Sequence, residues 1–300
     1  EIPAKMQKPA SDNLKRLISV GLENASLKFD SVKTFSTPRR LSIVFSGLPD
    51  KQPDLKEERK GPQVGASEQA IAGFLGSISG LKLSDCVQRD VKGKIFYYAV
   101  LDKKGESTAK VTKSVIETAL ITLANSWPKS MRWGSGTLRW ARPLHSILCL
   151  LDGVVVPVKL GALKATANTF GHRFLAPEKI DVVCFSDYQI KLKSARVLLN
   201  REERRQKIEN DANLLAKSKG LSLRADEDLL DEVTGLVEWP FTLMGSIDTD
   251  FMSLPPEVLI AAMRGHQKYF STLNDEGELA SKFIFVSNME ASDDGKAIIA

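Results

Sequence analysis

The chain contains 300 residues, of which 43% are hydrophobic and 26% are charged. This composition is typical of a soluble globular protein and excludes the disordered, fibrous and membrane classes, and the length predicts two or three domains. The 42 Lys and Arg residues outnumber the 37 Asp and Glu residues, which gives a net charge of +5. This balance permits a polyanionic partner but does not identify one.

The cysteines Cys86, Cys149 and Cys184 are odd in number and far apart in the sequence. This pattern supports neither a disulfide framework nor a zinc site with Cys-x-x-Cys spacing, so we expect a reducing, cytoplasmic location. The longest apolar runs, residues 147–151 and 154–158, are too short to cross a bilayer, and we therefore expect no membrane association. The chain begins without a methionine and ends without a polar tail, so we expect it to be part of a longer protein.

The first elements of the chain are predicted from their apolar spacing. Helical spacing predicts a helix over residues 14–28, and alternation predicts a half-buried strand within residues 34–48. Residues 50–65 are charged and contain Pro and Gly, which is typical of a solvated loop. This loop is expected to connect two packed parts of the protein.

A helix at residues 68–75, a hairpin at 92–94 and a helix at 109–124 are predicted next. Together they predict a small α+β insertion at about residues 66–126. The apolar segments that follow, around the turn dipeptide Asp-Gly, are expected to resume the sheet. We therefore predict an N-terminal α+β domain over residues 1–176 that contains this insertion.

Residues 177–300 are predicted to form a second α+β region with charged amphipathic helices. The helix expected at residues 200–218 carries apolar residues at i, i+4 and i+7, and its basic residues are expected on the outer face: Arg201, Arg204, Arg205 and Lys207. Asp226 opens an acidic cap for a further helix, and a hairpin is predicted at residues 274–277. The predicted fold class is α+β, multi-domain, with mixed or antiparallel sheets and packed helices.

Residues 127–143 contain three tryptophans and four cationic side chains among glycines and prolines. Guanidinium groups pair with phosphates, and indole rings offer flat faces for stacking, so the segment is typical of a nucleic-acid surface. The alternative is an irregular loop whose tryptophans fill a core while its arginines stay in water. Spacing alone does not separate these two interpretations. The residues concerned are Lys129, Arg132, Arg139, Arg142, Trp127, Trp133 and Trp140.

Common catalytic motifs are absent from the sequence. It contains no phosphate-binding glycine loop, no dinucleotide-binding fingerprint and no nucleophile elbow. The histidines His145, His172 and His266 are widely separated, so no metal site and no catalytic residue is predicted. His172 and His266 each follow a glycine and neighbour a cation and an aromatic residue, so each is either a ligand contact or an ordinary loop or helix-end histidine.

Eight short motifs, taken in their order, resemble the N-terminal part of the β subunit of the bacterial heterotetrameric glycyl-tRNA synthetase. The resemblance extends from about Glu1 to Glu290. Single motifs of this kind are weak, but eight in register are specific. They are Thr37-Pro38-Arg39-Arg40-Leu41, Arg59-Lys60-Gly61-Pro62, Met131-Arg132-Trp133-Gly134, Arg142-Pro143-Leu144-His145, Gly171-His172-Arg173-Phe174, Leu229-Leu230-Asp231-Glu232-Val233, Leu236-Val237-Glu238-Trp239-Pro240 and His266-Gln267-Lys268-Tyr269-Phe270.

The resemblance implies an enzyme whose chemistry is divided between chains. In that family the alpha subunit holds the class II catalytic core for ATP and glycine, while the β subunit is required for activity and recognises tRNA. We therefore expect this chain to bind no cofactor, with ATP and Mg²⁺ on the alpha subunit. The expected partners are that alpha subunit, tRNA(Gly) and a second β subunit in a heterotetramer. The family's C-terminal helical and anticodon-binding parts are absent, so this chain alone is not expected to charge tRNA.

The resemblance gives no settled catalytic residue in this region, and site roles are hypotheses. We expect phosphate contacts from the cations, stacking or sugar contacts from the rings, or contacts with the alpha subunit from the same set. The set is Arg39, Arg40, Lys129, Arg132, Trp133, Arg139, Arg142, His172, Arg173, His266, Lys268 and Tyr269. One alternative is a pure assembly module without RNA affinity, because Arg and Trp are also enriched in protein interfaces. A further alternative is a tRNA-editing hydrolase built around His172 or His266.

Overall fold

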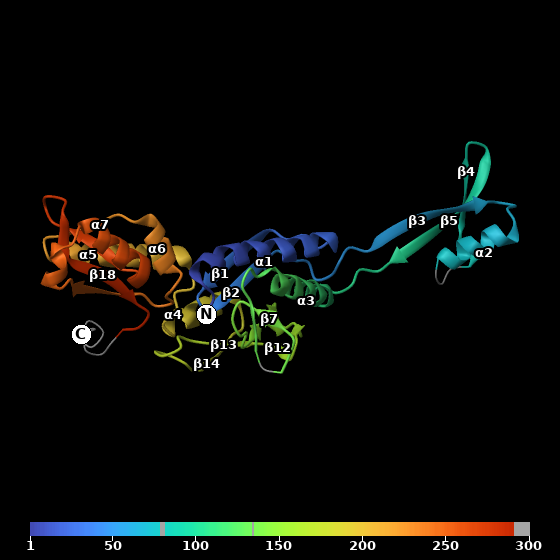
Figure 1. The fold of residues 1–300 in the computed structure, drawn as a ribbon. Helices are drawn as coiled ribbons and strands as arrows, with labels where there is room; N and C mark the ends of the chain where they lie inside the picture. The colour runs from blue at the N-terminus through green and yellow to red at the C-terminus, as the bar shows by residue number, and fades with distance from the viewer. Residues whose placement is uncertain (79–81, 134, 291–300) are drawn as a thin grey trace.

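A computed structural model describes residues 1–78, 82–133 and 135–290. Figure 1 shows an elongated molecule whose parts follow one another along its length. The distal unit, residues 55–103, lies at one end and the C-terminal body, residues 200–290, lies at the other. The central body, residues 1–54 and 104–199, lies between them and contains the N-terminus. In the described part of the chain, no helix is both long enough and apolar enough to span a membrane.

The central body is built around two packed helices, α1 (Ala4–Asn24) and α3 (Thr108–Ser126). Leu14, Leu22 and Leu123 are almost completely buried between them. Helix α1 also packs on a hairpin made of β1 (Ser31–Thr37) and β2 (Arg40–Ser46). The sequence predicted a single strand here, but Pro38 and Arg39 form a two-residue turn because proline fixes φ and cannot donate to a ladder.

The rest of the central body consists of very short strands followed by a helix. Strand β8 pairs in parallel with β12, and the other pairs are antiparallel. The helix packs on β1, since the rings of Phe35 and Phe185 lie 5.3 Å apart. The elements are β6 (Met131–Arg132), β7 (Arg139–Trp140), β8 (Ile147–Leu148), β9 (Leu150–Leu151), β10 (Val154–Val155), β11 (Lys159–Leu160), β12 (Leu163–Thr166), β13 (Asn168–Phe170), β14 (Lys179–Asp181) and α4 (Phe185–Ser194).

The distal unit is a three-stranded antiparallel sheet in the order β3-β5-β4, with α2 beside it. The sequence predicted a loop for most of β3. Its charged side chains are exposed, as predicted, but its backbone pairs with β5 from Leu55 to Lys60 and again at Gln63, which local composition does not reveal. Helix α3, which the sequence assigned to the insertion, packs on α1. The elements are β3 (Leu55–Gln63), α2 (Glu68–Ser77), η1 (Leu83–Asp85), β4 (Val87–Val91) and β5 (Lys94–Lys103).

The C-terminal body packs helices against an antiparallel sheet in the order β15-β17-β18-β16. Ile208, Val233 and Ile284 are almost fully buried in its core. A multi-domain α+β fold with mixed and antiparallel sheets is therefore confirmed. The elements are α5 (Arg201–Lys217), β15 (Ser222–Leu223), α6 (Glu227–Thr234), β16 (Phe241–Ser246), η2 (Thr249–Ser253), α7 (Pro256–Ala262), the π-helix η3 (Met263–Gln267), β17 (Phe270–Leu273) and β18 (Leu279–Ser287).

Candidate nucleic-acid interface

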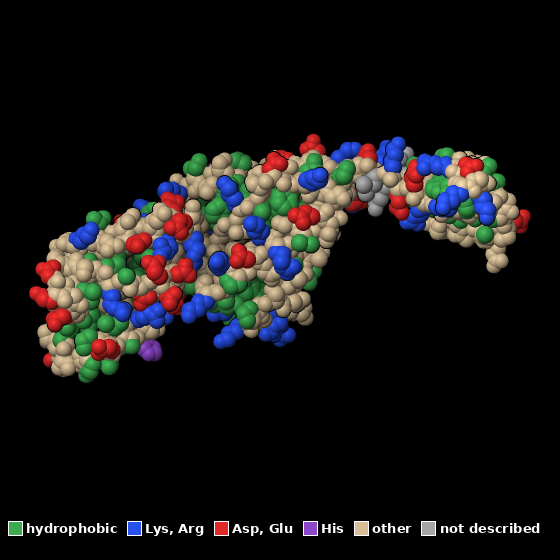
Figure 2. Space-filling model, turned by 90° about the horizontal axis from the view of Figure 1, so that it is seen from above, with side chains coloured by type: hydrophobic (Ala, Val, Ile, Leu, Met, Phe, Trp, Pro, Cys, Tyr) green, Lys and Arg blue, Asp and Glu red, His purple; other side chains and the backbone are tan. Residues whose placement is uncertain are grey.

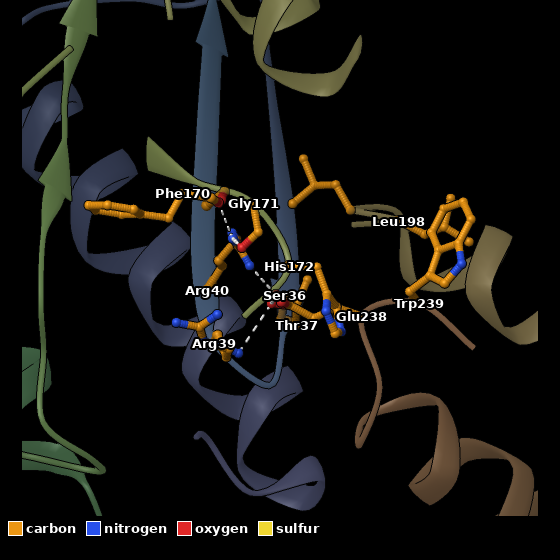
Figure 3. Close-up of polar contacts among 12 residues, drawn as sticks. Ser36, Thr37, Arg39, Arg40, Phe170, Gly171, His172, Leu198, Glu238 and Trp239 are labelled. Carbon is orange, nitrogen blue, oxygen red and sulfur yellow. Dashed lines mark hydrogen bonds and ion pairs between the residues drawn. The ribbon is translucent and has the colours of Figure 1, made fainter. Parts of the chain in front are cut away.

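A buried polar junction joins the central and C-terminal bodies. Arg40 and Glu238 form an ion pair, and the Thr37 hydroxyl donates to the same carboxylate oxygen at 2.6 Å. The second terminal nitrogen of Arg40 donates to the carbonyls of Phe170 and Gly171, the latter at 3.1 Å. Figure 3 shows these side chains converging from separate segments. Three motifs that are distant in the sequence therefore meet at one place.

The junction extends through the backbone of Glu238. Its N–H donates to Asn288 Oδ1 at 2.7 Å, and its carbonyl accepts from the Leu198 N–H at 2.9 Å. The neighbouring Trp239 ring lies under the guanidinium of Arg196, 5.0 Å from centroid to Cζ. The Oε2 atom of Glu238 is buried without a described protein partner. These hydrogen bonds therefore connect the end of β1, the end of β18 and the segment between α4 and α5.

Arg204 on α5 lies fully buried below this junction. Its terminal nitrogens donate to the carbonyls of Leu198 at 2.6 Å, Leu199 at 3.0 Å and Ser36 at 2.7 Å. Burial lowers the pKa of Arg204 to about 10. The expectation that Arg204 lies on the outer face of the helix is wrong, because it shares the buried i, i+4, i+8 stripe with Ile208 and Ala212. That spacing was the signal that could have identified it.

His172 is fully buried in the turn after β13. Its Nδ1 accepts from the backbone N–H groups of Phe174 at 3.3 Å and Leu175 at 3.2 Å, and the backbone N–H of His172 donates to the Ala195 carbonyl at 2.9 Å. These contacts fix the turn and leave Arg173 exposed beside Phe174, which is 63% exposed. His172 therefore holds the loop in this conformation, and Arg173 is the side chain that faces solvent.

Two predicted cations, Arg39 and Arg173, lie beside the junction, and a third, Arg142, is partly buried and donates to the Ala141 carbonyl at 2.7 Å. Burial is the largest influence lowering the pKa of Arg39, and the charges of Arg40 and Arg173 lower it further against the opposing effect of Glu238. The guanidiniums of Arg39 and Arg173 therefore lie close enough for their charges to act on each other.

The β6–β7 ladder carries a second cationic group. Arg132 lies directly opposite Arg139, and both are exposed, as is Lys129. Arg139 donates to the hydroxyl of Ser130 at 3.1 Å and to its carbonyl at 2.9 Å. Like charges placed opposite each other destabilise a ladder, and no carboxylate partner is found for either arginine in the described part of the chain. This pair is available for an anion.

The tryptophans of this segment divide between the two roles that the sequence left open. Trp127 and Trp140 are buried in the central core with ring centroids 5.5 Å apart, so both fill a core. Trp133 is only partly buried against that core. Of the three rings, Trp133 is therefore the one with surface remaining for a contact.

His266, Lys268 and Tyr269 lie apart from these groups, in the C-terminal body. Lys268 pairs with Glu232 at 3.1 Å, and Tyr269 stacks on Phe283 with centroids 4.4 Å apart and nearly parallel rings. His266 is exposed on η3. Figure 2 shows that cationic and acidic side chains are interspersed over this body, whereas Lys and Arg side chains gather along one edge of the central body.

No cluster of three His, Cys, Asp or Glu side chains that could hold a metal ion occurs in residues 1–78, 82–133 or 135–290. Comparison with known proteins gives the family. The sequence matches the family described as glycyl-tRNA synthetase beta subunit over residues 1–300. The chain belongs to this family.

Curated relatives agree with this assignment. The chain is 43% identical to the glycine-tRNA ligase beta subunit of Rhodospirillum centenum over its full length, which covers 45% of that protein. It is 46% identical to the corresponding subunits of Ruegeria and of Paracoccus denitrificans, again over its full length and 44% of each. As a member of the family, the chain therefore spans less than half the length of these relatives.

Proposed function

We propose that this chain contributes to the ATP-dependent attachment of glycine to tRNA(Gly) by binding tRNA phosphates and assembling with the alpha subunit. The observation that supports RNA binding is the exposed pair Arg132 and Arg139, held opposite each other without a carboxylate partner among the described residues. Guanidinium groups bind phosphate through paired N–H donors, so an anion would relieve the repulsion between the two side chains. Lys129, Arg39, Arg142 and Arg173 are proposed as further phosphate contacts.

The proposal assigns ATP, Mg²⁺ and the chemical step to the alpha subunit, within a cytoplasmic heterotetramer of two alpha and two beta subunits. Arg40 and His172 are given positioning roles, because the first is paired with Glu238 and the second is fully buried. Lys268 and Tyr269 are already engaged by Glu232 and Phe283. They are assigned no RNA contact here.

The test measures binding of labelled tRNA(Gly) to the chain across a salt series. The double variant Arg132→Gln/Arg139→Gln is compared with Arg205→Gln, whose guanidinium is already paired with carboxylates of Glu209 and Glu227. The double variant is expected to weaken binding and to reduce the slope of log affinity against log salt by about 1 to 2, one or less for each lost phosphate contact. Equal affinity and slope for the double variant and the wild type would refute the phosphate role.

Assembly with the alpha subunit has its own support. Val154 is 69% exposed and Val183 is 62% exposed. The two lie near each other, because a Cβ added at Gly153, the residue before Val154, would lie 3.4 Å from the carbonyl oxygen of Val183. Exposed apolar side chains that gather in this way mark protein contacts. We therefore propose that the alpha subunit contacts Val154 and Val183.

A further inference from the structure

The distal sheet has two faces that differ in what covers them. One face packs against α2. There, Arg59 donates to the Ser77 carbonyl at 3.0 Å, and Ala99, opposite Arg59, is fully buried. A Cβ at Gly61 would lie 2.6 Å from the Phe74 ring, so glycine is what lets the helix approach this strand. Figure 1 shows α2 along this sheet, far from the helices of the other bodies.

The opposite face carries two aromatic rings on the central strand. Side chains alternate along β5, so Phe96 and Tyr98 point away from the face that contains Ala99. Both rings are only partly buried, and Val87, paired with Tyr98, is 46% exposed. Residues two apart on one strand lie roughly 7 Å apart, so neighbouring rings can each receive one base of a strand that is not base-paired.

A cation lies over one face of each ring. The ammonium group of Lys60 lies 3.8 Å from the Phe96 ring centroid, and Arg89 Cζ lies 5.3 Å from the Tyr98 centroid. Arg89 is held in place by two hydrogen bonds to Glu58, at 2.8 and 2.5 Å, with its side chain 47% exposed. Lys60 is a long, flexible cation on the same face. Aromatic faces with adjacent cations are the combination that binds single-stranded nucleic acid.

We propose that this open face, formed by Lys60, Val87, Arg89, Phe96 and Tyr98, binds unpaired RNA bases. The bases stack on Phe96 and Tyr98, and Lys60 moves from the ring to a backbone phosphate. Charge favours RNA over a protein partner, because Lys60 and Arg89 bring two cations to the rings against the carboxylate of Glu58, which holds Arg89 in place. The inference rests on the proposed function in taking that RNA to be a single-stranded segment of the tRNA substrate.

The test uses the full chain and a labelled single-stranded RNA oligonucleotide, with a fully paired, blunt-ended RNA duplex as the comparator. Phe96→Leu/Tyr98→Leu is expected to weaken oligonucleotide binding by at least about fivefold for each ring removed, with little effect on the duplex. Tyr98→Trp is expected to keep the affinity, because it keeps a stacking face. The control is Gln88→Ala, an exposed change on the α2 side of the sheet. Thermal unfolding confirms that each variant is folded.

A second measurement does not depend on any variant. Ultraviolet cross-linking of a thiouridine-containing oligonucleotide to the wild-type chain is expected to label the β5 peptide. Cross-links only elsewhere, or unchanged oligonucleotide affinity in the double leucine variant, would overturn the inference. Loss of alpha-subunit binding in that variant, with RNA binding intact, would make the face a protein contact and would also overturn it.

The two proposals fail separately. If wild type binds tRNA and loses that binding in Arg132→Gln/Arg139→Gln, while the leucine variant binds the oligonucleotide normally, only the inference about the distal face is refuted. If the chain binds the oligonucleotide through β5 but does not bind tRNA, the open face remains a site for single-stranded RNA. In that case the proposed function is the part that fails.

Discussion

The guanidinium of Arg40 is paired with the carboxylate of Glu238, although the two residues are 198 positions apart in the chain. The Glu238 side chain is 1% exposed and that of Arg40 is 10% exposed. Removing one partner of such a buried pair leaves an uncompensated charge. The pair therefore holds the central and C-terminal bodies in a fixed relationship.

Glu238→Gln is expected to lower the free energy of unfolding by about 3 kcal/mol, because it leaves Arg40 buried without its counter-ion. The double variant Arg40→Met/Glu238→Gln is expected to lose less free energy of unfolding than the sum of the losses in the two single variants. Urea denaturation followed by tryptophan fluorescence measures both. The exposed pair Arg89 and Glu58 is the control, and its Glu58→Gln change is expected to cost no more than about 1 kcal/mol. Equal losses at the two pairs would contradict the buried role.

Arg204→Lys is expected to destabilise the chain by about 3 kcal/mol. Lysine cannot reproduce the forked geometry that reaches the carbonyls of Ser36, Leu198 and Leu199 at once, so buried acceptors lose their donors. The neighbouring change Arg205→Lys keeps a charge on the solvent side and is expected to stay within about 0.5 kcal/mol of wild type. Thermal unfolding of the two variants is the comparison. A loss no larger for Arg204 than for Arg205 would show that the buried contacts contribute little.

Asp226 is expected to make stability depend on pH. It caps α6 by accepting from the Leu229 N–H at 3.0 Å and also accepts from Arg264 at 2.5 Å. Burial acts to raise the pKa of Asp226, but these contacts outweigh it, and the pKa lies below the ordinary value of 3.8. A depressed carboxyl pKa adds stability above the unfolded value, and that stability is lost as pH falls through the folded value.

Asp226→Asn keeps a cap but removes the charge, so it is expected to cost about 1 kcal/mol at pH 7. The difference between variant and wild type is expected to shrink as pH falls below about 4, because the carboxylate of the unfolded wild-type chain then binds a proton while that of the folded chain stays ionised to lower pH. Urea denaturation from pH 7 to pH 3.5 tests this. A difference independent of pH would mean that the contact with Arg264 does not depend on charge.

The cysteines are expected to react in a defined order. Hydrogen bonding with Ser186 lowers the pKa of exposed Cys184, whereas burial raises the pKa of Cys149 to about 11. Burial also raises the pKa of Cys86. Because the thiolate reacts, iodoacetamide at pH 8 should label Cys184 first and Cys149 last, with Cys149 gaining reactivity only as pH approaches its pKa. Mass spectrometry of the peptides over time gives the rates, and first labelling at Cys149 would show that its site opens readily.

The apolar pair Val154 and Val183 is expected to be needed for alpha-subunit binding. Val154→Asp/Val183→Asp introduces charges into the proposed contact and should reduce co-purification with the alpha subunit by tenfold or more, about 1.4 kcal/mol. Leu214→Asp is the matched control, since Leu214 is 67% exposed but lies on α5 in the C-terminal body. Normal capture of the double variant would place the alpha-subunit contact elsewhere.

The sequence correctly predicted the elements that depend only on residues close together in the chain. The Lys92-Gly93 turn has positive φ at both residues, as the hairpin prediction required, and Asp226 caps its helix. The pairing of β3 and the burial of Arg204 were not predicted, because both depend on partners far away in the sequence. For the candidate site, the sequence identified the cationic residues but could not distinguish exposed Arg132 from Arg40, which is paired across the junction.

Paired strands join the distal sheet to the central body, and their length determines how far the distal sheet extends from that body. The ten residues of β5 span roughly 30 Å when extended, and its pairing with β3 stiffens the arm against the bending available to a single linker. If both proposed contacts exist, a ligand bound at the tip and at Arg132 and Arg139 must span a distance that is set by the length of this arm.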